Sequence, residues 1–222
     1  MQKRKIIIGG YDTAAHGWTL TAWKLSAAVQ KTAYVEKPNG DGSWDLSTAL
    51  SDGIPRYQTR ELKVTLECSE GARMEREEVI REMVNQLDGL PWSIRLPDDE
   101  HHYITGRVHV AREYNDLAHG AVTVTAVCDP WKYANEETVV SLTATTTEKV
   151  AQIINDGRRA VVPTLKVEGT DASVTIGYKD SSLALSEGTH QWPVLLLTSG
   201  NHPITYSGTG KLTITYREAV LE

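Results

Sequence analysis

The chain has 222 residues, which is enough for one large domain or for two small ones that each bury a hydrophobic core. It contains 23 basic and 29 acidic residues, giving a formal net charge of −6. Contacts to nucleic-acid phosphates need clustered Lys and Arg, and the clearest cluster is at residues 3–5, so the composition argues against nucleic-acid binding as the main function. No apolar run approaches the roughly 20 residues of a membrane-spanning helix, and the N-terminus lacks a signal-peptide pattern. We therefore expect a soluble protein without an export signal.

The chain has two cysteines, Cys68 and Cys128, and each ends a strand-like alternation. Their spacing leaves a disulfide open, but the lack of a cysteine framework fits a reducing compartment such as the cytoplasm. We therefore expect them to be small buried hydrophobic residues.

Strand candidates precede a marked turn region. Apolar and polar residues alternate over residues 18–22, and residues 32–35 form a further short candidate. Residues 38–43, with the sequence PNGDGS, give the densest turn signal in the chain, because two glycines there can adopt positive φ. We expect an exposed loop here, followed by a polar stretch up to Arg60.

Residues 73–88 are the one segment with a sustained helical hydrophobic period. Apolar residues recur at three- and four-residue steps, and charged or polar residues fill the opposite face. Acidic residues in the first turns suit the positive end of the helix dipole, and Gly89 with Pro91 behind it is a typical C-terminal stop. A lone amphipathic helix needs an apolar partner, so we expect it to cover a sheet face. The apolar positions are Val79, Ile80, Met83, Val84 and Leu87.

Strand patterns flank this helix on both sides. Residues 61–68 alternate polar and apolar side chains throughout, which is typical of a strand with one buried face. Further alternating segments follow at residues 92–96, 103–111 and 121–128. The gaps between consecutive strands are too short for helical crossovers, so we predict antiparallel pairing and an α+β N-terminal domain.

The composition changes after Trp131, and we place the boundary between domains of residues 1–136 and 137–222. In the second domain a short helical pattern at residues 147–152 precedes strand candidates at intervals of about 8–12 residues, which is typical of a β-sandwich. The predicted fold class is therefore mainly β, with one amphipathic helix. The strand candidates are residues 161–167, 173–178, 183–185, 194–198, 202–206 and 211–217, and the turns are at residues 155–157, 169–171, 199–201 and 208–210.

Two polar runs carry potential metal ligands. The loop at residues 39–45 places oxygen-bearing side chains at alternate positions, as a calcium loop does, but Trp44 stands where glycine is needed and Leu50 where a bidentate glutamate is needed. A plain turn explains it better. Residues 98–102, DDEHH, are adjacent, and neighbouring residues in a strand point to opposite faces, so a solvated hairpin tip is the simpler interpretation.

No catalytic motif is present: there is no G-x-S-x-G, Walker loop, dinucleotide fingerprint, H-E-x-x-H or C-x-x-C. We therefore expect a protein that is not an enzyme and has no cofactor or metal. In the second domain Tyr178, His190 and Trp192 could line a sugar-binding face. Core packing of Trp192 beside Pro193 is the more common outcome for such a residue.

Several short motifs occur in a characteristic order. They are PNGDG at 38–42 with WDLS at 44–47, the strand at 60–68, the acidic helix ending LDG at 87–89, LPDD at 96–99 and CDPW at 128–131. In this order they resemble the distal tail proteins of long, non-contractile-tailed bacteriophages (siphophages), over most of the N-terminal half. Downstream, NDG at 155–157, VPT at 162–164, GN at 200–201 and TITY at 213–216 resemble the galectin-like sandwich that completes that family.

This chain departs from the family pattern at two points. The family often has Pro-Gly directly, whereas Asn39 intervenes here. The long insertions with which some members carry carbohydrate-binding modules are absent from the sequence.

The resemblance implies a structural baseplate hub at the virion tail tip, assembled in the cytoplasm of the host bacterium. Its N-terminal domains would close into a homo-hexameric ring from which the C-terminal domains project. The ring would join the tail tube protein to a tail-tip, tail-fibre or tail-associated lysin protein. It would surround a channel for the tape measure protein and the DNA, with no membrane contact and no sequence-specific nucleic-acid contact.

Two loops, at residues 38–47 and 95–103, are candidates for inter-subunit or partner binding, and solvent-exposed turns are the alternative for both. An alternative function for the chain is a carbohydrate-binding module that uses the C-terminal sandwich for attachment to the host surface. The candidate partner-binding residues are Asn39, Asp41, Ser43, Trp44 and Asp45 in the first loop and Asp98, Asp99, His101 and Tyr103 in the second.

Overall fold

The computed structural model describes residues 4–68, 73–113 and 120–222. This part of the chain is mainly β with one helix, and every strand pair whose register is described is antiparallel, which confirms the predicted fold class. Two compact units form, Met1–Lys132 and Tyr133–Glu222. The boundary between residues 136 and 137 that the composition indicates stays a prediction. None of the described helices is long and apolar enough to cross a membrane.

The first unit is built on one antiparallel sheet. Its strands are β1 (Ile7–Ile8), β2 (Tyr11–Asp12), β3 (Thr19–Leu25), β6 (Arg60–Cys68), β7 (Pro91–Arg95), β8 (His102–Glu113) and β9 (Gly120–Ala134). Neighbouring strands follow the order β2-β1-β7-β8-β9-β6-β3, so β3 and β2 lie at opposite ends of the sheet. The alternating segments around the helix form β6, β7, β8 and β9, as predicted.

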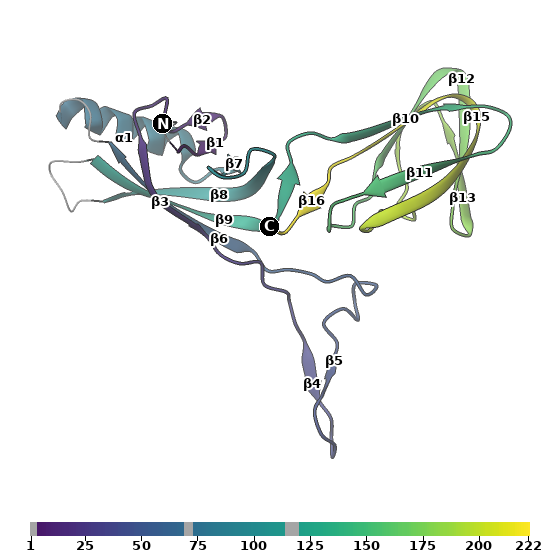
Figure 1. Ribbon diagram of the computed structural model, residues 1–222, viewed down its shortest axis with the longest axis horizontal. Helices are drawn as coiled ribbons and strands as arrows, with labels where there is room; N and C mark the ends of the chain where they lie inside the picture. The colour runs from purple at the N-terminus through teal and green to yellow at the C-terminus, as the bar shows by residue number, and fades with distance from the viewer. Residues whose placement is uncertain (1–3, 69–72, 114–119) are drawn as a thin grey trace. The chain divides into compact units, whose positions relative to one another are not determined.

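The helix α1 (Arg73–Leu87) lies along one face of this sheet and contacts β8 (Figure 1). Met83 and Leu87 are buried in the core, as the apolar period predicts. Gly89 has a φ of 76° and donates its N–H to the carbonyl of Val108 at 2.8 Å, while the Trp92 indole donates to the carbonyl of Leu87 at 3.1 Å. The predicted stop at Gly89 is confirmed, and the helix end is fastened to the sheet.

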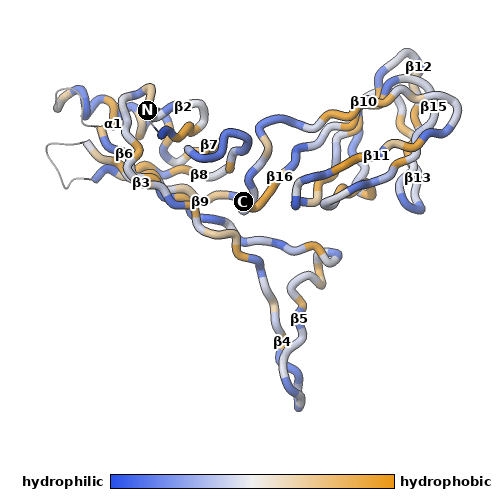
Figure 2. Tube along the Cα trace, in the orientation of Figure 1, coloured by the Kyte–Doolittle hydropathy of each residue, from blue (hydrophilic) through white to orange (hydrophobic). Residues whose placement is uncertain are grey.

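Alternate residues of the central strands form the core under the helix, and Figure 2 shows hydrophobic residues along β8 and β9. Cys68 and Cys128 are both buried here as thiols that form no disulfide among the described residues, which confirms their expected role as small hydrophobic residues. Burial, with a further contribution from Asp129, raises the pKa of the Cys128 thiol to about 12, so it stays protonated and unreactive.

A long excursion leaves the sheet between β3 and β6, and we call residues 26–59 the arm. It contains a small separate hairpin of β4 (Tyr34–Glu36) and β5 (Ser43–Asp45). The residues of this hairpin and of its turn are exposed, as predicted for residues 38–43, and the arm contributes no residue to the core of the unit (Figure 1).

The second unit contains β10 (Thr138–Ala144), β11 (Lys149–Asn155), β12 (Thr164–Tyr178), β13 (Ser181–Ser186), β14 (Gly188–Gln191), β15 (Gly200–Tyr216) and β16 (Ala219–Val220). The long strands β12 and β15 pair with each other and change partners along their length. The first part of β15 pairs with β11 and the last part with β10, while the first part of β12 pairs with β14 and the last part with β13. Two half-sheets thus enclose one core, as in a sandwich.

Three expectations for the second unit are wrong. Residues 147–152 are not helical, because residues 149–155 pair with β15 as the strand β11. Residues 194–198 are not a strand: a turn lies at residues 193–194, Leu195 and Leu197 are buried, and the one described bridge joins Leu197 to Val161. The glycines at 169 and 208–210 bend β12 and β15 rather than end them, since both strands continue through these positions.

Candidate partner-binding surfaces

The base of the arm is fixed to the sheet. Ser26 donates its N–H to the carbonyl of Glu61 at 2.8 Å, and the Arg60 guanidinium donates to the carbonyl of Ser26 at 2.6 Å. Further along, the Tyr57 ring meets the edge of Trp131 with ring centroids 5.2 Å apart. The arm therefore starts from a defined position beside β6 and β9.

The hairpin of the arm is held by its own hydrogen bonds. Leu46 donates its N–H to the carbonyl of Ala33 at 2.8 Å, and Ala33 donates its N–H to the Ser47 hydroxyl at 2.9 Å. The Ser47 hydroxyl and the Ser47 N–H hold the pKa of the Asp45 carboxyl below its usual range, the N–H donating to Oδ1 at 2.9 Å. Asn39 takes a positive φ of 58° in the turn. The hairpin is thus a formed element, and none of the described residues of the arm belongs to the hydrophobic core of the unit.

Large apolar side chains are exposed along the arm. Single exposed apolar residues are ordinary, but a concentration on one element marks an interaction surface. Trp44 stands out, because 49 % of it is exposed and Trp is the residue type most enriched among those that dominate binding energy. The exposed residues are Val29, Tyr34, Val35, Trp44, Leu46 and Leu50.

The structure brings Asn39, Asp41, Ser43, Trp44 and Asp45 together on this one hairpin. The arrangement is compatible with either interpretation of the loop, as an exposed turn or as a docking element. The exposed Trp44 is the feature that a simple turn leaves unexplained.

The second predicted loop, between β7 and β8, is a fixed turn organised by Asp99. Its Oδ1 accepts hydrogen bonds from the N–H of His102 at 3.1 Å and from the His102 ring at 2.9 Å, and its Oδ2 lies 3.1 Å from the Lys132 ammonium. Burial alone would raise the pKa of Asp99, but the hydrogen bonds from His102 and Lys132 outweigh it and lower that pKa. The turn is thereby tied to the end of β9.

The other residues of this loop lie around Asp99. The Asp98 carboxylate is 3.8 Å from the Arg4 guanidinium, His101 is exposed and Tyr103 is half-buried on β8. Among the described residues, no group of His, Cys, Asp and Glu has the arrangement of a metal site.

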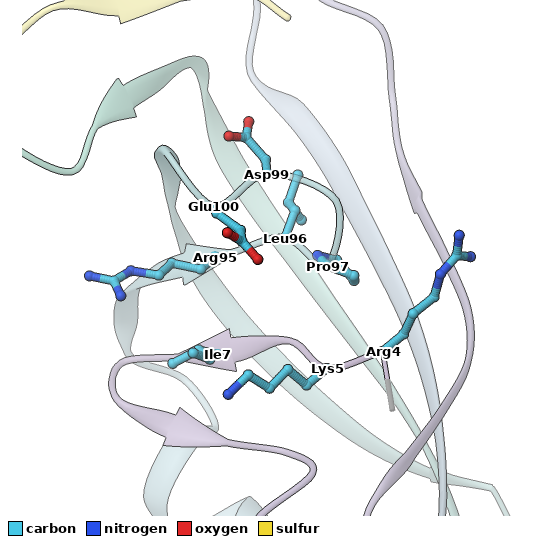
Figure 3. A pocket seen from close by; sticks show the side chains of 8 residues that line it. All are labelled: Arg4, Lys5, Ile7, Arg95, Leu96, Pro97, Asp99 and Glu100. Atoms are coloured by element: carbon cyan, nitrogen blue, oxygen red, sulfur yellow. The ribbon is translucent and has the colours of Figure 1, made fainter. Parts of the chain in front are cut away.

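A cavity of about 320 Å³ lies between this turn and the N-terminal strand. Its apolar part is made by Ile7, Leu96 and Pro97, and its polar part carries both signs of charge. In Figure 3 the Lys5 and Arg95 side chains extend to the same side and Arg4 extends the other way. The lining residues are Arg4, Lys5, Ile7, Arg95, Leu96, Pro97, Asp99 and Glu100.

Sequence reasoning found only half of this cavity. Loop 95–103 stands out as polar and turn-rich, but residues 4–7 come about 90 positions earlier and pair with β7 through a two-residue strand. A pattern of two residues carries no usable period. The pairing of β1 with β7 therefore has no signal in the sequence.

The three candidate sugar-binding residues do not form one exposed face. Tyr178 and Trp192 belong to the core of the second unit, and the Tyr178 hydroxyl is 2.8 Å from Nδ1 of the buried His202. His190 lies on β14, beside the other half of β12, with its Nε2 2.8 Å from the carbonyl of Ser186. Neither buried ring is available to stack on a sugar.

Comparison with known proteins gives a full-length structural match and no sequence match. No family model matches the chain, and no curated protein matches it. Among solved structures, the chain is similar to the crystal structure of the Dit protein of phage SPP1, described as a paradigm of the hub adsorption apparatus in phages that infect Gram-positive bacteria. The TM-score is 0.70 at 14 % identity, covering 96 % of this chain and 98 % of that one. The chain therefore has the fold of the SPP1 Dit protein over nearly its whole length.

Proposed function

We propose that this chain is a structural distal tail protein of a long, non-contractile-tailed bacteriophage. Copies of it form a hexameric hub ring at the tail tip, which joins the tail tube protein to a tail-tip, tail-fibre or tail-associated lysin protein. The tape measure protein and the DNA pass through the ring. The single observation that carries this proposal is the match to the SPP1 Dit fold, which spans both units rather than one common domain.

The arm supports an assembly function rather than a catalytic one. A closed ring needs heterologous contacts, in which one surface of a copy meets a different surface of the next. An element that is anchored at its base, formed at its tip and rich in exposed apolar side chains supplies one of these two surfaces. The arm residues Asn39, Asp41, Ser43, Trp44 and Asp45 are accordingly proposed as inter-subunit contacts.

The residues Asp98, Asp99, His101 and Tyr103 are proposed as a second contact region. Asp99 is the structural centre of this turn and holds the neighbouring side chains in place. The proposed role of this region is contact with a neighbouring chain.

The test is the mass of the full-length chain in solution, alone and with its tail-tip neighbour, measured by mass photometry and followed by negative-stain imaging. A species of six copies, seen as a ring with a central channel, is the expected result, whether it forms alone or on addition of the partner. A chain that stays monomeric at all concentrations and with both the tube and the tip protein present contradicts the hub function.

A further inference from the structure

We propose that the cavity between the N-terminal strand and the β7–β8 turn receives the tip of the arm from a second copy of this chain, with Trp44 as the anchor. This inference rests on the proposed hub function and names the surface that the arm contacts. It is carried by three observations: the positions of arm and cavity in the sheet, the apolar wall of the cavity, and the exposed Trp44 on the arm.

The order of the strands places the arm and the cavity toward opposite ends of the same sheet. The arm leaves between β3 and β6, the last two strands at one end. The cavity is lined by residues of β1, β7 and the turn after β7, near the other end. The arm and the cavity are therefore two different surfaces of one copy. Contact between one copy's arm and the next copy's cavity is therefore head-to-tail, the type of contact that a rotation repeats into a ring.

The cavity has the chemistry to hold an indole ring. Its volume is at the lower end of the range of about 300–1,000 Å³ typical of ligand pockets, and Ile7, Leu96 and Pro97 give it an apolar wall. The Arg95 side chain makes no hydrogen bond or ion pair with any residue that the structure describes, so its guanidinium can stack on an aromatic ring. Lys5 is held by Asp12 at 2.6 Å, and Asp99 by His102 and Lys132.

The arm tip matches this cavity in both apolar and charged character. Trp44 is half-exposed and does not belong to the hydrophobic core of its unit. Asp41 lies three residues before it, exposed and without a described ion pair, so it can pair with Arg95 across the contact. An aromatic anchor in a pocket beside one charge pair is the usual composition of an interface centre.

The first experiment joins two different copies by a disulfide. Full-length chains carrying Ser43→Cys on the arm and Pro97→Cys on the cavity are mixed and oxidised under the conditions in which the chain assembles. We expect the mixed dimer at a level at least ten-fold above that from Ser43→Cys mixed with Val127→Cys, because Val127 is exposed on β9 outside the cavity. The unmodified chain is the blank, since its own cysteines are buried.

The second experiment measures self-association. Trp44→Ala should weaken it at least ten-fold, whereas Met74→Ala, at an exposed position of α1 outside the arm and the cavity, should leave it unchanged. Asp41→Arg and Arg95→Asp should each weaken association, and the two together should restore it toward the level of the unmodified chain.

The outcomes separate this inference from the hub function. If the chain assembles but the Ser43–Pro97 pairing does not exceed the Val127 control, the cavity is not the receptor and the hub function stands. If one chain that carries both Ser43→Cys and Pro97→Cys forms the disulfide within itself while the mixed single-cysteine chains do not, the arm folds back on its own copy and the inference is overturned. If neither assembly nor the mixed dimer forms, both proposals are overturned.

Discussion

Asp99 is the residue that joins the β7–β8 turn to the end of β9, and its ionisation links the turn to pH. It accepts two hydrogen bonds from His102 and faces the Lys132 ammonium at 3.1 Å, with 18 % of its side chain exposed. Its pKa in the folded chain is below the usual value of about 3.9, so the charged form is favoured by folding. Its contribution to stability is therefore complete above about pH 4 and is lost as the pH falls through the folded-state pKa.

We predict that Asp99→Asn lowers the free energy of unfolding of the first unit by about 1–2 kcal/mol at pH 7. The loss should shrink as the pH falls below 4, because the unmodified chain then loses the same charge. Urea unfolding of both chains at pH 7, 5 and 3 checks this. An equal difference at all three values contradicts the role of the charge.

Gly89 is the residue at which the helix stops. Its φ of 76° lies in the left-handed region, and a Cβ there would meet nothing within 4 Å, so only backbone strain opposes a side chain. Gly89→Ala should cost about 1–2 kcal/mol of stability. Gly40→Ala is the matched control, since Gly40 has no positive φ and its Cβ would make only an ordinary contact. Thermal unfolding should show a lower midpoint for Gly89→Ala alone, and equal midpoints would remove the capping argument.

At the scale of elements, α1 is stabilised by the face it presents to the sheet. Met83 is fully buried whereas Met74, on the same helix, is 84 % exposed. We predict that Met83→Ala costs about 2–5 kcal/mol, because it removes buried apolar volume, and that Met74→Ala costs almost nothing. Chemical denaturation with both variants measures the difference. Similar losses for the two would mean that the helix does not pack on β8 as described.

The bend of β15 at Gly208 is a second element-scale feature. A Cβ at this position would lie 2.0 Å from the carbonyl oxygen of Ser173, and the φ of 131° disfavours side chains as well. Gly208→Ala should therefore destabilise the second unit strongly, while Gly200→Ala, with positive φ but open space, should cost only the backbone strain. Thermal unfolding of the two variants separates the steric clash from the backbone strain. Equal losses of stability in the two variants would show that the clash at Gly208 contributes nothing.

These elements show what the sequence alone could and could not predict. The sequence predicts β6, β8 and β9 from their long alternation and α1 from its helical period, because one face of each element is buried. The bends of β12 and β15 look like turns, since a chain reversal and a bulge both use residues at positive φ. The segment that forms β11 looks weakly helical, and its pairing with β15 overrides that local preference.

The candidate contact surfaces were predictable to different degrees. The sequence predicts the tip of the arm as a turn-rich loop. It does not predict that the arm extends from residue 26 to 59, because a polar stretch gives no signal for which flanking strands pair with each other. The cavity forms only because Ile7 pairs with Arg95, and the sequence gives no periodic signal for this long-range contact. Local patterns therefore identify the element that projects and miss the surface that receives it.

At the scale of the whole molecule, the arm is separable from the fold that carries it. No residue of the arm belongs to the hydrophobic core of the first unit, and its base is closed by the bonds between Ser26 and residues 60 and 61. Replacing residues 31–56 by a short Gly-Ser linker keeps these bonds and the contact of Tyr57 with Trp131, and longer or shorter loops change stability only slightly. The variant should therefore unfold within about 1 kcal/mol of the unmodified chain.

The same deletion should abolish assembly, because a heterologous ring loses one of its two contacting surfaces. Mass photometry of the deleted chain should show monomers under conditions in which the unmodified chain forms six-membered rings. Mixing the two chains adds a sharper check: deleted copies still present the cavity but no arm, so they should end growing assemblies and shift the population to open species of fewer than six copies. Rings that form with the deleted chain alone would show that the sheet edges, rather than the arm, close the circle.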